Sequence, residues 1–173
     1  DKPWMTELFQ RIAIVGCSGG GKSTLARALA ARTDLPLIHL DREFWQPGWK
    51  DKPPEAWLAR HTALINEPRW IIEGSYAATL PERAAAADLI VFVDLPRWQC
   101  LWRILRRTLT TYGRVRDDMA PGCPERFNIA FLRYIWNFRA QNNPRIERAI
   151  TCHEAVRLNT RQSVDVWLES IEP

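Results

Sequence analysis

The sequence predicts an α/β fold in which a parallel β-sheet is covered by helices on both faces. Two observations lead to this prediction. Short apolar runs alternate with helical patterns along the whole chain, and this alternation is typical of parallel sheets with right-handed helical crossovers. The 173 residues, 46% of them hydrophobic, suffice for one domain with a substantial core and are few for two. We therefore expect residues 1–173 to form a single three-layer domain.

Three strands and two helices are expected in the first half of the chain. The apolar run after Arg11 is short, β-branched and ended by Gly16, as in a buried strand. "LPLIHLD" has the same strand character, and so does "RWIIE", which Gly74 stops. The expected strands cover residues 12–15, 35–41 and 70–73. One helix is expected from Lys22, in alanine-rich sequence with apolar residues at helical spacing. Another is expected over residues 55–66, after a turn-rich aromatic segment.

The second half predicts two strands and five helices. "DLIVFVDLP" is the fourth expected strand and "EAVRLN" the last. The expected helices cover residues 81–87, 97–110, 125–141, 144–150 and 163–171. A polar loop with two glycines and two prolines joins the second and third of these helices, and such a composition is typical of a flexible connection.

Composition narrows the classes of protein to which the chain can belong. The four cysteines are scattered without a C-x-x-C pair, which argues against a zinc site and a disulfide framework. No apolar stretch approaches the roughly 20 residues that span a bilayer, and the N-terminal sequence lacks the apolar segment of a secretory signal. We therefore expect a cytoplasmic protein with reduced thiols and no membrane partner.

The stretch "GCSGGGKST", residues 16–24, fits the pattern G-x-x-x-x-G-K-[ST] between an expected strand and an expected helix. In such a P-loop the glycines let backbone N–H groups turn toward phosphate oxygens, and the helix start adds positive partial charge. Lys22 would reach the β- and γ-phosphates of ATP, and the Ser23 hydroxyl would ligate Mg²⁺. The alternative is a flexible glycine turn with an ordinary exposed lysine. The residues expected to bind the nucleotide here are Gly16, Ser18, Gly19, Gly20, Gly21, Lys22, Ser23 and Thr24.

Three acids follow expected strands, at the edge where open α/β sheets bind ligands. They are Asp41, Glu73 and Asp94. We expect Glu73 to serve the metal side and Asp41 to orient the acceptor hydroxyl or phosphate, with Glu43 a weaker candidate. Asp94 could hold magnesium in place of Glu73. For each acid the alternative is a helix cap or a solvated side chain.

Six arginines and no acid lie between Arg97 and Arg116. Helical spacing puts Arg103, Arg106 and Arg107 on one face, where an anionic ligand would relieve their mutual repulsion. The alternative is a solvated helix face. We expect a lid over about residues 106–125, in which Arg114 closes over the triphosphate. An acceptor-binding insert is expected over about residues 42–69. Arg42 and Arg83 are expected on the acceptor side, and a surface position is the alternative for Arg83.

Several of these segments resemble the nucleoside monophosphate kinases. "GCSGGGKST" matches the P-loop, "WIIEG" is similar to the acid-Gly element of adenylate kinases, and "DLPRWQCLWRILRR" resembles the strand, turn and helix that lead into the lid. The resemblance implies a strand order of 2-3-1-4-5 and a helical lid. It also implies that Glu73 supports the water shell of magnesium, that Arg103 stacks on adenine, and that Arg107 meets phosphate. The usual adenylate kinase pattern for AMP is not evident in the acceptor segment, which instead carries Trp45, Trp49 and Trp57.

A resemblance to the bacterial DNA topology modulation proteins, a group related to adenylate kinase, covers nearly the whole chain. It is carried by "IHLDREFWQPGW", "WIIEGSY", "DLPRWQCLWR" and "DMAPGCPERFNIAFLRYIWNF". The resemblance implies ATP binding and phosphoryl transfer, and the family name implies an effect on DNA supercoiling.

The leading hypothesis is therefore a kinase that uses Mg-ATP and a small-molecule acceptor, which could be a nucleotide. In this hypothesis the residues that act on the reacting groups are Lys22, Asp41, Arg107 and Arg114. One alternative is a regulatory ATPase that binds DNA, although the arginine block lies where a lid is expected and no nucleic-acid motif is recognisable. Another alternative is a protein that binds ATP without turnover. The oligomeric state is left open.

Overall fold

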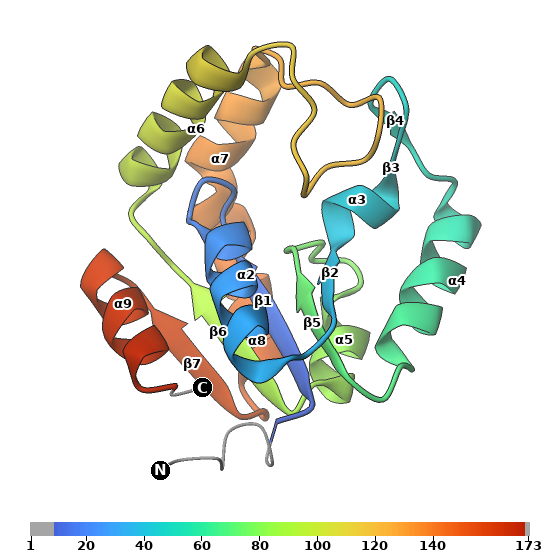
Figure 1. Ribbon diagram of the computed structural model, residues 1–173, viewed down its shortest axis with the longest axis vertical. Helices are drawn as coiled ribbons and strands as arrows, with labels where there is room; N and C mark the ends of the chain where they lie inside the picture. Colours follow the sequence, from blue (N-terminus) through green and yellow to red (C-terminus); the bar gives the residue numbers. More distant parts are fainter. Residues whose placement is uncertain (1–8, 172–173) are drawn as a thin grey trace.

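The computed structural model describes residues 9–171 and shows a five-stranded parallel sheet between two layers of helices (Figure 1). The strands are β1 (Arg11–Gly16), β2 (Leu37–His39), β5 (Trp70–Glu73), β6 (Leu89–Val93) and β7 (Ala155–Leu158). They lie in the order β2-β5-β1-β6-β7, with every neighbouring pair parallel. This confirms the predicted α/β sandwich and the order 2-3-1-4-5.

The three central strands are buried along almost their whole length, since helices cover both faces of the sheet. In the register, Ile14 of β1 lies opposite Glu73 of β5, and Gly16 lies opposite Val93 of β6. The carboxyl ends of these strands therefore meet at one edge of the sheet. The P-loop, Glu73 and Asp94 all emerge from this edge.

The helices divide between the two faces of the sheet. On one face lie α2 (Lys22–Thr33) and α9 (Arg161–Glu169), which contact each other. On the other lie α5 (Leu80–Ala86), α7 (Ile129–Gln141) and α8 (Asn143–Ile150), with α6 (Arg97–Thr111) packed against α7. The helix α4 (Pro54–Ile65) lies beyond the β2 edge (Figure 1). Within residues 9–171, none of the helices combines the length and the apolar character that crossing a bilayer requires.

Three segments differ from the sequence prediction. The strand β2 ends at His39, and Asp41 lies in the short helix α3 (Leu40–Phe44) rather than at a strand end. Beyond it, β3 (Trp45–Gln46) and β4 (Lys50–Asp51) form an antiparallel hairpin where only a turn was expected. The helix α7 begins at Ile129, four residues later than predicted, because the Asn128 side chain accepts a hydrogen bond from the backbone N–H of Phe131 and caps the helix.

Candidate active site

The P-loop is a tight turn between β1 and α2, pressed against α6. Gly19 has φ +81°, and a Cβ there would lie 2.4 Å from the carbonyl oxygen of Cys100, so no larger residue fits. Gly21 precedes α2 with φ +90°, and no side chain caps the helix. The first N–H groups of α2 are therefore available to a ligand, as in other helix N-termini that bind phosphate.

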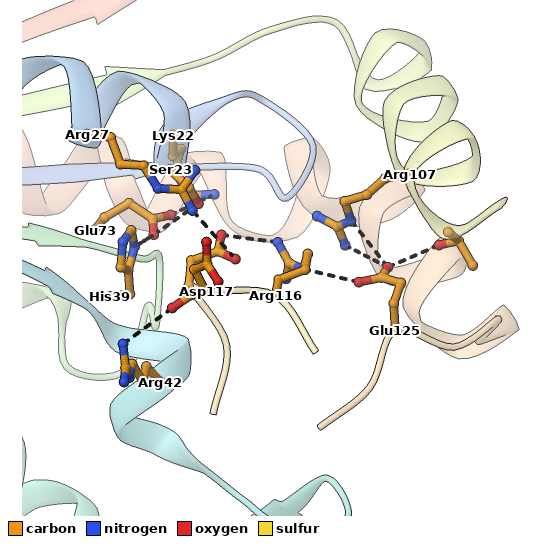
Figure 2. Close-up of polar contacts among 12 residues, drawn as sticks. Lys22, Ser23, Arg27, His39, Arg42, Glu73, Arg107, Arg116, Asp117 and Glu125 are labelled. Atoms are coloured by element: carbon orange, nitrogen blue, oxygen red, sulfur yellow. Dashed lines mark hydrogen bonds and ion pairs between the residues drawn. The ribbon is translucent and has the colours of Figure 1, made fainter. Parts of the chain in front are cut away.

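Lys22 and Ser23 both point toward Glu73 (Figure 2). The Lys22 Nζ lies 3.1 Å from the carbonyl oxygen of Cys17 and 3.7 Å from Glu73 Oε1. The Ser23 hydroxyl donates to Glu73 Oε2 over 3.3 Å, and His39 Nδ1 lies 3.0 Å from the same oxygen. Lys22 is 8% exposed, so the alternative of an ordinary exposed lysine does not hold.

The two acids nearest the P-loop hydroxyl are held in the ionised form. Burial alone would raise the pKa of Glu73, but the hydrogen bond with His39 and the charge of Lys22 lower it below its ordinary value. Burial likewise opposes ionisation of Asp118, but the charge of Arg116 and a hydrogen bond with Ser23 lower the pKa of that carboxyl. Two carboxylates thus lie close to Ser23.

Asp41 has the opposite electrostatic character. Its pKa is raised, first by burial of the carboxyl and then by the charge of Glu73. The Tyr76 hydroxyl donates to Asp41 Oδ1 over 2.6 Å and partly offsets this effect. The Tyr76 ring packs against Phe44 and Trp57, with centroid distances of 5.1 Å to each. Asp41 therefore has a fixed orientation and a proton affinity higher than that of an exposed aspartate.

The arginines of α6 and of the following loop do not all face the same way. The Arg103 Nη1 lies 3.4 Å from the carbonyl oxygens of Gly19 and Gly20. Arg107 and Arg116 both pair with Glu125, at 3.0 and 3.1 Å (Figure 2). Arg106 is exposed to solvent. The helix therefore presents Arg103 and Arg107, but not Arg106, to the P-loop side.

One cavity of about 1070 Å³ extends from the P-loop across the ends of β1 and β5 to the loop after α6. It joins most of the residues that the sequence singled out. The expected site residues that line it are Ser18, Gly19, Gly21, Lys22, Ser23, Thr24, Asp41, Glu73, Arg103, Arg107 and Arg114. Gly16 and Gly20 shape the loop without lining the cavity. The P-loop and the carboxyl of Asp41 thus open into one space.

Solved structures share this arrangement of strands and helices. The fold is that of the shikimate kinases. A shikimate kinase from Acinetobacter baumannii, in complex with shikimate, matches with a TM-score of 0.60 and 19% identity over 99% of this chain and 94% of that chain. One from Bacteroides thetaiotaomicron matches with a TM-score of 0.58 and 17% identity over 94% and 95% of the two chains. One from Aquifex aeolicus matches with a TM-score of 0.53 and 16% identity over 92% and 95%.

The sequence comparisons, unlike the structural ones, gave no match. No family model matches the chain, and no curated protein matches it. The shikimate kinase fold is a P-loop fold related to that of adenylate kinase. The structural matches therefore support the fold that the resemblance to the nucleoside monophosphate kinases implied. They lend no support to the predicted link with DNA topology.

Three residues that the sequence predicted at the site, Arg42, Arg83 and Asp94, do not line the cavity. Arg83 was expected on the acceptor side or at the surface, but it is fully buried beneath the loop after β5. There it donates to the carbonyl oxygens of Gly74 and Ser75, over 2.9 and 2.6 Å. Arg42 lies outside the cavity lining and approaches the backbone carbonyl of Asp117 at 3.4 Å. Arg83 is therefore not at the surface, and neither arginine lines the cavity.

Asp94 also lies away from the cavity, although β6 ends beside the P-loop. Its carboxylate accepts hydrogen bonds from Arg139, Asn143 and Arg157, and it is 5% exposed. These hydrogen bonds to the buried carboxylate link β6 to α7, α8 and β7. Of the two acids considered for the magnesium side, Glu73 therefore lies beside the P-loop serine, and Asp94 does not.

Four residues at the site were missed by sequence reasoning. They are His39, Tyr76, Asp118 and Glu125, of which Tyr76, Asp118 and Glu125 line the cavity. A sequence signal existed for Asp118 and Glu125, because they are among the first acids after the arginine block. An acid that follows a cluster of arginines within one loop is a natural partner for them. No comparable signal marks His39 or Tyr76.

The residues around Ser23 fit a magnesium ion that is bound together with a nucleotide. A serine hydroxyl and the carboxylates of Glu73 and Asp118 are hard oxygen donors, which Mg²⁺ prefers. Within residues 9–171, no three histidine, cysteine or acidic side chains converge to form a metal cage. Mg²⁺ in phosphoryl transfer sites needs none, since it keeps several waters and takes further ligands from the phosphates.

Proposed function

We propose that the protein is an ATP-dependent kinase that transfers the γ-phosphate to a hydroxyl of a small molecule. The observation that carries this proposal is the single cavity that joins the P-loop to Asp41. The fold shared with the shikimate kinases, one of which was solved in complex with shikimate, supports it.

In the proposed complex the P-loop amides and Lys22 hold the β- and γ-phosphates. Arg103, which lies beside the carbonyl oxygens of Gly19 and Gly20, faces the nucleotide end of the cavity. Arg107 and Arg114 line the cavity from α6 and the lid. Their guanidinium groups stabilise the negative charge on the transferred phosphoryl group, because a low-dielectric cleft strengthens such contacts.

Ser23 and Glu73 would hold Mg²⁺ or its bound waters, with Asp118 close by. When bound, the metal neutralises charge on the β- and γ-phosphate oxygens. The ion pair between Lys22 and Glu73, at 3.7 Å, keeps both side chains at the phosphate end of the cavity.

At the acceptor end, Asp41 orients the attacking hydroxyl and takes its proton. The acceptor oxygen forms a bond to the γ-phosphorus while the bond from that phosphorus to the β,γ-bridging oxygen breaks, and ADP leaves. The raised pKa of Asp41 suits this role, since a general base works best when its pKa lies near the working pH. Tyr76 fixes the carboxyl through its 2.6 Å hydrogen bond.

A coupled assay of ADP release tests the proposal, with Mg-ATP and a panel of hydroxylated metabolites, nucleosides and nucleoside monophosphates as acceptors. We expect at least one acceptor class to stimulate turnover. With that acceptor, Asp41→Asn should lower kcat by about a hundredfold or more and leave the Kd for ATP within about threefold, since Asp41 does not bind the nucleotide. Lys22→Ala should weaken ATP binding itself. Tight ATP binding without turnover across the panel would contradict a kinase and favour a nucleotide-binding protein.

A further inference from the structure

Glu125 is a buried carboxylate at the base of the lid that two cavity arginines share. It is 6% exposed. Its Oε1 accepts from Arg107 Nε over 3.2 Å and Nη2 over 3.0 Å, and its Oε2 pairs with Arg116 Nε at 3.1 Å. Figure 2 shows both guanidinium groups in contact with this carboxylate. One acid thus fixes two cations from different parts of the chain.

The backbone around Glu125 holds it rigidly in place. Its N–H donates to the carbonyl oxygen of Arg114 and its own carbonyl accepts from the N–H of Gly113, each over 2.8 Å. The Thr108 hydroxyl donates to Oε1 over 3.1 Å. The two ends of the loop 113–125 are therefore joined at Glu125, and the same residue is bonded to α6. Its carboxylate has a fixed position relative to the helix that carries Arg107.

The pattern of hydrogen bonds leaves one amino group free on each arginine. Arg107 uses Nε and Nη2 on Glu125, and Arg116 uses Nε on Glu125 and Nη1 on Asp118. Among the residues that the structure describes, no hydrogen bond or ion pair engages Arg107 Nη1 or Arg116 Nη2. Both arginines line the cavity. Each guanidinium group therefore has one NH₂ group that can donate a hydrogen bond to a ligand in the cavity.

Two guanidinium groups this close to one carboxylate repel each other. Burial lowers the pKa of Arg107, and the charge of Arg116 lowers it further, whereas Glu125 opposes both effects. Without a carboxylate between them, the two side chains would separate and turn toward solvent. The arrangement at the cavity wall therefore depends on Glu125.

We propose that Glu125 is a positioning residue that aims the free amino groups of Arg107 and Arg116 at the terminal phosphate of a bound nucleoside triphosphate. This inference rests on the proposed function. Glu125 does not itself contact the nucleotide, because a carboxylate would repel phosphate. It acts through the arginines, whose contacts are with the γ-phosphate and not with the part of the nucleotide that ADP shares.

The test compares the binding of Mg-ATP and Mg-ADP by calorimetry, which requires no knowledge of the acceptor. Glu125→Gln keeps the size of the side chain but replaces one acceptor oxygen with an NH₂ group that faces a guanidinium. We expect the Kd for ATP to rise by about tenfold to a hundredfold, the size of one charge-assisted contact, and the Kd for ADP to change by less than about threefold. A merely structural role would weaken both nucleotides equally.

Glu147→Gln is the matched control. Glu147 pairs with Arg157 at 3.1 Å and is half exposed, and it does not line the cavity, so both Kd values should stay at the wild-type level. Equal loss of ATP and ADP binding in Glu125→Gln, or no loss of either, would overturn the inference alone. A wild-type protein that binds neither nucleotide would overturn the proposed function as well.

Arg107→Gln and Arg116→Gln keep the inference testable if Glu125→Gln fails to fold. Each of these variants leaves Glu125 paired with the other arginine, so the buried carboxylate is not stranded. Each should lower the preference for ATP over ADP. An unchanged preference in both arginine variants would contradict the inference.

Discussion

The hydrogen bond from the Tyr76 hydroxyl affects the pKa of the Asp41 carboxyl. Burial and the charge of Glu73 raise its pKa, and the hydroxyl of Tyr76 lowers it again by stabilising the carboxylate. A hydrogen bond to a charged group contributes about 1.5–3 kcal/mol, and a pKa unit corresponds to about 1.4 kcal/mol. The phenol therefore opposes the effects of burial and of Glu73 and favours the ionised form of Asp41.

Tyr76→Phe should raise the pKa of Asp41 further. The change removes the donor and keeps the ring that packs on Phe44 and Trp57. With more of Asp41 protonated at a given pH, the acid limb of a pH–rate profile should move to higher pH. Carbon-13 NMR titration of the Asp41 carboxyl gives the shift directly.

Tyr134→Phe is the control for this experiment, since Tyr134 also lines the cavity but makes no hydrogen bond to Asp41 among the bonds of residues 9–171. It should leave the titration of Asp41 nearly unchanged. A Tyr76→Phe protein whose Asp41 titrates at the wild-type pH would show that the phenol has no such influence.

At the scale of elements, α4 and α5 are joined by a buried pair of basic side chains. His61 is 2% exposed, and Arg83 is fully buried. The Arg83 Nη1 lies 3.3 Å from His61 Nε2, and Nη2 reaches the loop after β5. Burial, together with the charge of Arg83, lowers the pKa of His61 to about 4. The imidazole thus serves as a neutral acceptor for the guanidinium.

This pair should make the stability depend on pH. In the unfolded chain His61 has an ordinary pKa of 6.5, so between pH 6.5 and about 4 the unfolded state binds a proton that the folded state does not. The free energy of unfolding should therefore fall as the pH drops through this window, by at most about 1.4 kcal/mol per unit. Above pH 6.5 this contribution is fully present.

Urea unfolding at several pH values, with wild type and His61→Gln, separates this effect from the titration of the carboxylates. Glutamine can accept a hydrogen bond from Arg83 but does not titrate, so the variant should lose less stability than the wild type between pH 6.5 and 4. If the free energy of unfolding falls equally for the two proteins over that pH range, His61 is not the source of the pH dependence.

At the scale of the whole molecule, the loop after α6, which the sequence predicted as a lid, rests on the β3–β4 hairpin. The N–H of Gly48 donates to the carbonyl oxygen of Gly122 over 2.8 Å, and Trp49 Nε1 donates to that of Pro124 over 3.0 Å. Met119, Ala120 and Cys123 of the lid loop pack with Trp45 and Trp49 of the hairpin in a small cluster apart from the main core. The two segments that the sequence predicted as lid and acceptor insert thus meet at the cavity wall, which Trp45, Trp49 and Met119 line.

Gly122→Ala should release these contacts. Gly122 has φ +76°, and a Cβ there would lie 2.9 Å from the Pro47 Cβ, so the lid must move off the hairpin. We expect faster amide hydrogen exchange in residues 113–125 by mass spectrometry, with little change in the Tm, because the sheet core is untouched.

Gly113→Ala is the control for Gly122→Ala, because it introduces a similar backbone strain without a contact with Pro47. Gly113 has φ +74°, but a Cβ there meets nothing within 4 Å. If both variants increase exchange in the lid equally, the contact with Pro47 is not what holds the lid closed.

Much of the fold and part of the site could be predicted before any coordinates. Alternating strands and helices, together with the residues of the P-loop, are local patterns. They determined the layers, the place of Lys22 and Ser23, and the presence of Glu73 at the same edge of the sheet. The strand order came from the resemblance to a known family.

The remaining features depend on contacts between distant residues, which local pattern does not encode. Arg107 and Glu125 are 18 residues apart, and Arg42 and Asp117 are 75 apart. Whether Arg83 is buried or Arg106 exposed depends on which neighbours cover each side chain. The sequence by itself determined the architecture and the phosphate-binding loop. Tertiary packing decided which acids and arginines face the cavity. It also set their pKa values, because these depend on partners that only folding brings together.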